Sequence, residues 1–161
     1  MAKTPEAINP QQNIDVMPQV KKERNDGGRM SVQDIIKADL DREGKADNFP
    51  KVYQALANML ATNKTRMMRA GNTLFPYTMI QPGVVEFHVI NGDSPKNLGK
   101  NLKEFYDAML KANFKMGVST TENPQILKLA ESVGIPVESR QSQRFNGKQM
   151  VPTIEVIIRG Q

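Results

Sequence analysis

The segment from Asn91 to Leu110 combines turn-forming residues, a glycine between lysines and an apolar-striped helix. Gly99 lies between Lys96 and Lys100, close to the expected helix start. A first helical turn has unpaired N–H groups with partial positive charge, a glycine lets an anion approach the backbone, and lysines add charge. The spacing fits a pyrophosphate site, and it equally describes an ordinary, well-capped surface helix.

Glu86 and His88 are the candidates for acid–base chemistry. They are two residues apart in an alternating apolar segment, so they share one face of the expected strand while Val85, Phe87 and Val89 share the other. Either side chain could take a proton from a substrate, directly or through water. The alternative is that Glu86 lies in solvent and His88 is a satisfied, partly buried histidine.

Composition excludes several classes of protein. The 161 residues suffice for one domain, and there is no cysteine, hence no disulfide, thiolate site or Cys nucleophile. The single histidine excludes a His-rich metal site, so we expect no metal. The sequence has no apolar run of membrane-spanning length and no signal-peptide pattern, so we expect a soluble, intracellular protein without a membrane partner.

The net charge of +5 and pI near 9.5 favour an anionic partner such as a phosphorylated cofactor, nucleic acid or an acidic protein surface. Basic residues that could contact nucleic acid are Lys21, Lys22, Arg24, Arg66 and Arg69. The nine aromatic residues fall mostly on apolar stripes and form no stacking platform. A solvated basic surface is therefore favoured over nucleic-acid binding.

Hydrophobic periodicity predicts the elements that position these residues. Two helices, 31–44 and one within 47–63, precede three antiparallel strands near 65–70, 73–80 and 84–91. A helix at about 97–111, a short strand, a helix ended by Gly134 and two strands joined through Asn146-Gly147 follow. The predicted fold is an α/β domain with a mixed sheet in the order α-α-β-β-β-α-β-α-β-β.

Residues 1–30 differ from the rest of the chain. They contain three prolines, a basic cluster and few apolar residues without a period. Such a segment buries too little surface to offset its ordering entropy. We expect a flexible arm over 1–30 that becomes ordered on a partner, and one domain over 31–161.

This order resembles the GNAT superfamily of acyl-CoA N-acyltransferases, most closely over 84–160. The family's pyrophosphate pattern, Arg/Gln-x-x-Gly-x-Gly/Ala, is similar to the run from Lys96 through Gly99 to Asn101, where asparagine replaces the final small residue. A second family pattern resembles "NPQILKLAESVGI", with Ala130 in place of the tyrosine that commonly protonates the departing thiolate. The resemblance implies that an oxyanion would bind a backbone N–H near Val89 or Ile90. It implies coenzyme contacts at Val89, Ile90, Lys96, Leu98, Gly99, Lys100, Asn101 and Asn123.

A looser resemblance is to the GNAT-like internal virion proteins of short-tailed phages, which share the Gly-Lys loop, the Asn-to-Gly helix and the missing tyrosine. It implies a degenerate, non-catalytic structural protein, made in the host cytoplasm and carried in the virion, that contacts other virion proteins or itself through residues 1–30. The alternative is an active N-acetyltransferase that uses acetyl-CoA on an amine. Ala130, Asn101 and the long arm favour the first interpretation, and enzymatic activity is left open.

Overall fold

The computed structural model describes residues 28–160. The expected arm therefore lies outside the described residues, except for residues 28–30, and so do the contacts predicted for it. No helix within 28–160 has the length and apolar character needed to cross a membrane.

The domain opens with two amphipathic helices, α2 (Val32–Arg42) and α3 (Phe49–Ala61), joined by a 3₁₀ turn, η2 (Ala46–Asn48). Ser31 caps α2 because its hydroxyl accepts the N–H of Asp34 at 3.0 Å. Pro50 lies in the first turn of α3, where its missing N–H costs nothing. The apolar stripes of the two helices pack on each other and on Leu74.

A seven-stranded mixed sheet forms the centre of the domain. Its strands are β1 (Thr65–Ala70), β2 (Thr73–Gln81), β3 (Val84–Phe87), β4 (Ile90–Asn91), β5 (Met116–Thr121), β6 (Val137–Phe145) and β7 (Met150–Arg159). The order across the sheet is β1-β2-β3-β5-β7-β6, with β4 continuing the line of β3 beside β2. All pairs are antiparallel except β3 with β5, where the crossover makes them parallel.

The expected strand 84–91 is divided at residues 88 and 89, and Pro76 on β2 is the reason. Tyr77 pairs with Phe87 and Leu74 with Ile90, so the register is unbroken and Pro76 stands opposite His88. The N–H of His88 donates to the carbonyl of Pro76 at 2.9 Å, but proline has no N–H to return. One ladder bond is therefore missing, and the strand is split without a bulge.

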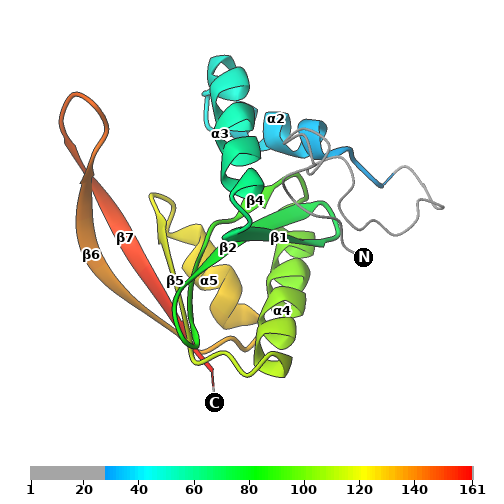
Figure 1. The fold of residues 1–161 in the computed structure, drawn as a ribbon, viewed down its shortest axis with the longest axis vertical. Helices are drawn as coiled ribbons and strands as arrows, with labels where there is room; N and C mark the ends of the chain where they lie inside the picture. The colour runs from blue at the N-terminus through cyan, green and yellow to red at the C-terminus, as the bar shows by residue number, and fades with distance from the viewer. Residues whose placement is uncertain (1–27, 161) are drawn as a thin grey trace.

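Helices cover the two faces of the sheet unequally (Figure 1). On one face, α4 (Pro95–Lys111) and α5 (Gln125–Ser132) pack over a core that includes Phe75, Phe87 and Phe105. On the other face, α2 and α3 cover only the β1, β2 and β4 region. The β6–β7 hairpin extends away from the body of the domain, as Figure 1 shows. The predicted mixed sheet and element order are confirmed.

Candidate functional site

The sheet opens between β3–β4 and β5. The two strands pair from Val84 with Met116 to Glu86 with Val118, and beyond this point no pairing continues. β4 stays with β2 while β5 stays with β7. The separation leaves a gap in the middle of the sheet.

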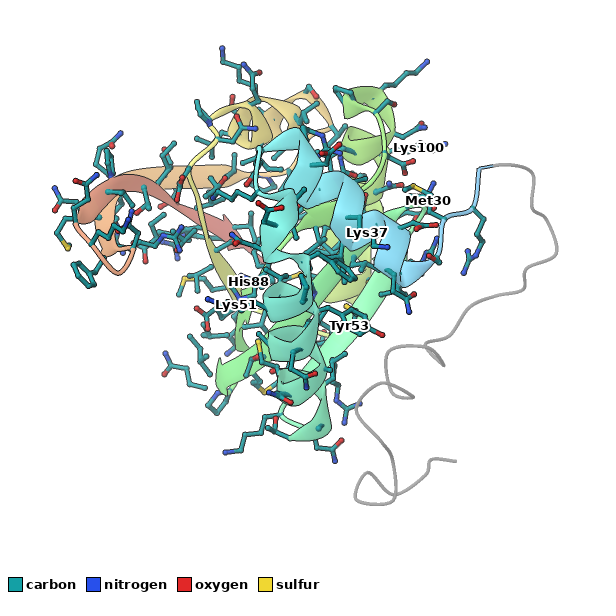
Figure 2. All side chains as sticks on the ribbon, turned by 90° about the horizontal axis from the view of Figure 1, so that it is seen from above. Met30, Lys37, Lys51, Tyr53, His88 and Lys100 are labelled. Carbon is teal, nitrogen blue, oxygen red and sulfur yellow. The ribbon has the colours of Figure 1, made fainter. Side chains whose placement is uncertain are left out.

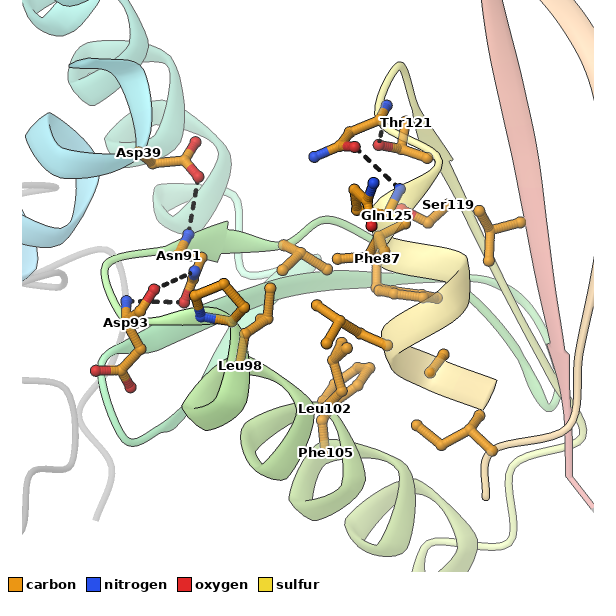
Figure 3. A pocket seen from close by; sticks show the side chains of 18 of the residues that line it. Asp39, Phe87, Asn91, Asp93, Leu98, Leu102, Phe105, Ser119, Thr121 and Gln125 are labelled. Atoms are coloured by element: carbon orange, nitrogen blue, oxygen red, sulfur yellow. Dashed lines mark hydrogen bonds between the residues drawn. The ribbon is translucent and has the colours of Figure 1, made fainter. Parts of the chain in front are cut away.

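A cavity of about 480 Å³ fills this gap. Its depth is apolar, with Phe87 from β3, Leu102 from α4 and Leu129 from α5 among its walls. Its mouth is polar, with the end of α2 and Asn91 on one side and the end of β5 with the following loop on the other (Figure 3). The polar mouth residues are Asp39, Arg42, Glu43, Asn91, Asp93, Ser119, Thr120, Thr121, Asn123 and Gln125.

Val89 places an unpaired backbone N–H on the cavity wall. The N–H of His88 faces β2, so alternation turns the N–H groups of Val89 and Asn91 towards the gap. The N–H of Asn91 donates to Oδ1 of Asp39 at 3.0 Å, which confirms the direction. None of residues 28–160 accepts the N–H of Val89. An unpaired N–H at a cavity wall can bind an oxyanion.

Of the two backbone groups predicted for this role, the structure favours Val89 over Ile90. Ile90 pairs with Leu74 in the ladder, so its N–H faces β2, and Ile90 does not line the cavity. Leu98 and Asn123 also lie at the cavity wall. The coenzyme role of these residues stays a prediction.

The beginning of α4 is capped from within the chain. Ser94 accepts the N–H of Asn97 at 3.4 Å, a long bond, and the N–H of Leu98 donates to the Ser94 carbonyl at 2.8 Å. The N–H of Lys96 has no acceptor among the described residues, and the side chains of Lys96 and Lys100 are exposed. The first turn therefore retains one free N–H and two cations for an anion.

Gly99 has a packing role that the sequence did not reveal. It is buried in α4, and a Cβ there would lie 3.3 Å from Cγ1 of Val133 and 3.8 Å from Cδ2 of Leu129. The glycine thus allows α4 and the end of α5 to approach closely, and it does not line the cavity. Its predicted contact with a pyrophosphate stays a prediction, and close helix packing already accounts for the residue.

Asn101 belongs to a buried polar network that fixes the loop after β4. Its side-chain NH₂ donates to Oγ1 of Thr73 at 2.9 Å and to Oδ2 of Asp93 at 2.8 Å. Asp93 also accepts from the backbone N–H of Asn72 at 2.9 Å, and its own N–H donates to Oδ1 of Asn91 at 3.0 Å. The network turns the Asp93 carboxylate away from the cavity (Figure 3). Asn101 therefore holds α4 to β2 and to this loop.

Asp39 is a cavity residue that sequence analysis missed. It is on α2, far along the chain from β4, and only the tertiary fold brings its carboxylate to Asn91. Burial raises the pKa of Asp39 above its ordinary value, the nearby Glu43 raises it further, and the hydrogen bond from Asn91 with the Arg42 charge opposes the rise. The only sequence signal was an acidic residue among the polar positions of an amphipathic helix.

Glu86 and His88 do not reach the cavity. Both are exposed, and they face the side of the sheet opposite to Phe87 and Val89, which line the cavity. Figure 2 looks onto the side that carries α2 and α3, where His88 is labelled. Glu86 and His88 share one face of the strand, as predicted, but His88 is exposed and is not the partly buried histidine of the alternative interpretation. Their assignment as bases stays a prediction.

Within the described part of the chain, no tyrosine hydroxyl is free to act at the cavity. Ala130 is buried at the wall, as the sequence implied for the position of the missing tyrosine. Tyr106 also lines the cavity, but its hydroxyl donates to the carbonyl of Arg159 at 3.1 Å. Within residues 28–160, no cluster of His, Asp or Glu side chains is arranged to hold a metal ion.

Comparison with known proteins identifies the fold. No protein-family model matches the chain, and no curated protein matches it. A GNAT superfamily phosphinothricin acetyltransferase from Sinorhizobium meliloti, solved with acetyl-CoA, is 12% identical over 82% of this chain and 86% of its own, with a TM-score of 0.52. A chimera of spermidine N-acetyltransferase from Vibrio cholerae and hSSAT is 16% identical over 69% of this chain and 76% of its own, with a TM-score of 0.50. The domain therefore has the GNAT fold.

Proposed function

We propose that this protein is an acyltransferase that moves an acetyl or similar acyl group from a coenzyme A thioester to an amine. The observation that carries the proposal is the unpaired N–H of Val89 at the wall of an apolar cavity between separated strands. A thioester carbonyl gains negative charge on its oxygen when an amine attacks, and a preorganised N–H stabilises that charge.

The shape and polarity of the cavity fit the reacting end of such a substrate. Apolar walls from β3, α4 and α5 suit an acyl chain, and the backbone of Val89 and the unpaired end of β5 offer groups to the amides of a pantetheine arm. At the beginning of α4, the N–H of Lys96 and the cations of Lys96 and Lys100 suit a phosphate. The Asp93 carboxylate opposes an anion there, but its hydrogen bonds direct it to Asn72 and Asn101.

The departing thiolate needs no acid from this chain. Ala130 supplies none, and the hydroxyl of Tyr106 is committed to Arg159. A thiolate is a good leaving group, so solvent can protonate it after the C–S bond breaks. The missing tyrosine therefore lowers the rate without preventing the reaction.

The second candidate is a non-catalytic protein on the same fold, for which the looser sequence resemblance implies a role in a phage virion. The hydrogen-bonded loop around Asp93 and Asn101 favours it, since this loop offers an anion little open backbone. Ala130 favours it as well. Virion association and the contacts of residues 1–30 stay predictions.

Replacing Val89 by proline tests the proposed function. The change removes the one N–H assigned to the oxyanion without breaking a ladder bond, because that N–H faces away from β2. We expect thiol release from acetyl-CoA with an amine to fall by about 10²–10³-fold in Val89→Pro, and much less in Val89→Ala, which keeps the N–H. The absence of cysteine makes thiol detection free of protein background.

The control is the binding of acetyl-CoA, which both Val89 variants should retain while their circular dichroism stays native. Wild-type protein that binds acetyl-CoA but transfers no acyl group to any amine would support the non-catalytic candidate. Equal rates in Val89→Pro and Val89→Ala would remove the oxyanion assignment.

A further inference from the structure

We infer that Asp39 accepts the proton that the attacking amine loses, and that this carboxylate is the base of the reaction in place of Glu86 or His88. The inference rests on the proposed acyl transfer. Asp39 lies at the mouth of the cavity, whereas Glu86 and His88 are exposed on the other face of the sheet from Phe87 and Val89.

The Asp39 carboxylate is bound to the same strand edge that carries the oxyanion donor. Oδ1 of Asp39 accepts the N–H of Asn91 at 3.0 Å, and Val89 presents its N–H two residues earlier in the same direction. Two residues of extended strand span about 7 Å. A thioester carbonyl bound to the N–H of Val89 and the Asp39 carboxylate bound to the N–H of Asn91 leave room between them for an amine nitrogen and one water molecule.

The two carboxylate oxygens of Asp39 differ in their hydrogen bonds. Both hydrogen bonds of the Asp39 side chain go to Oδ1, one from Asn91 and a long one of 3.5 Å from Nη1 of Arg42. Oδ2 has no hydrogen-bond partner in the described part of the chain, and the side chain is 22% exposed. One oxygen is thus fixed in place while the other is free to take a proton.

The charges around Asp39 suit this role. Arg42 at the end of α2 and Glu43 directly after it lie near Asp39, and Asp93 follows β4 on the same side of the mouth. The cavity walls that β5 and α5 contribute contain no charged side chain among the described residues. Burial raises the pKa of Asp39, which makes it a stronger base than an ordinary aspartate.

The proposed step balances. The free amine forms a C–N bond to the thioester carbon, and the electron pair of the carbonyl moves to the oxygen that Val89 holds. The amine proton passes through water to Oδ2 of Asp39. The carbonyl re-forms as the C–S bond breaks, the thiolate takes a proton from solvent, and Asp39 returns its proton to solvent.

The test is the Asp39→Asn variant of the full chain, which keeps an oxygen to accept the N–H of Asn91 but cannot take a proton. The probes are acetyl-CoA and spermidine, and thiol release is followed over pH. Below the pKa of Asp39 the amine and the carboxyl must both lose a proton, so log(kcat/KM) rises with a slope of about two, and above it with a slope of about one. Asp39→Asn should have a slope of about one throughout and a kcat/KM about 10²–10⁴-fold lower.

The matched control is Asp41→Asn, the same change on α2 at an exposed position that does not line the cavity. It should keep the wild-type rate and pH profile. Binding of acetyl-CoA should be unchanged in Asp39→Asn, which separates loss of the base from loss of the site.

The outcomes distinguish the inference from the proposed function. The inference alone is overturned if the wild type is active and Asp39→Asn keeps both slopes. It is also overturned if the steeper slope is lost in Glu86→Gln and kept in Asp39→Asn. A wild type that neither binds acetyl-CoA nor releases thiol overturns the proposed function and the inference with it. If Asp39→Asn does not fold, a wild-type profile with a slope of about one at every acidic pH still overturns the inference.

Discussion

Replacing Asn101 by alanine should destabilise the domain more than any other single amide change on α4. The side-chain NH₂ of Asn101 is buried and makes two hydrogen bonds, one to neutral Thr73 at 2.9 Å and one to the Asp93 carboxylate at 2.8 Å. A neutral bond contributes about 1 kcal/mol and a bond to a charged group about 1.5–3 kcal/mol. The free energy of unfolding should therefore fall by about 3 kcal/mol.

Urea unfolding followed by circular dichroism measures this loss, and thermal unfolding should show a Tm lower by roughly 10 °C. Asn97→Ala is the matched control, because Asn97 is exposed on the same helix and only its backbone N–H is used in the cap. It should change the free energy of unfolding by no more than about 0.5 kcal/mol. A loss below about 1 kcal/mol in Asn101→Ala would refute the structural role of the network.

Three further predictions concern the cavity and its walls. Asp39→Asn should raise the free energy of unfolding at about pH 7 but not at about pH 3.5. The pKa of Asp39 is raised in the folded state, so its favourable contribution is present below the ordinary value of 3.8 and is lost as pH rises through the folded pKa. Urea unfolding at both pH values checks this. Gly99→Leu should lower the free energy of unfolding by about 1–3 kcal/mol, since a Cβ there already lies 3.3 Å from Val133, and a stability equal to wild type would contradict the close packing. Tyr106→Phe should keep the rate of thiol release while losing about 1 kcal/mol of stability with its bond to Arg159, whereas a large loss of rate would identify Tyr106 as the missing acid.

Local patterns were sufficient to predict the element order. The apolar stripe that includes Ile35 and Ile36, the alternation around Phe87 and the turn at Asn146-Gly147 each depend on a few neighbouring residues. The break at His88 could not be predicted in this way, because its cause, Pro76, stands on the partner strand and depends on the register between two strands.

The candidate site could be predicted only in part for the same reason. Val89 was one of two candidates, and the direction of its N–H became clear only from the pairing of its neighbours. Asn101 was noted as the residue that departs from the family's pyrophosphate pattern, but its partners Thr73 and Asp93 come from two other segments and could not be predicted. Asp39 carried no signal beyond being an acidic residue on an amphipathic helix, because the fold alone brings α2 to the end of β4.

Calorimetric titration of the full chain with acetyl-CoA shows whether the cavity binds the coenzyme, with Ala130→Phe as the blocked variant. Ala130 is buried at the wall of the 480 Å³ cavity, so a phenyl ring at this position would take up cavity volume. We expect saturable heat for the wild type and none for folded Ala130→Phe. Absence of heat in the wild type, or the same binding curve for both proteins, would contradict it.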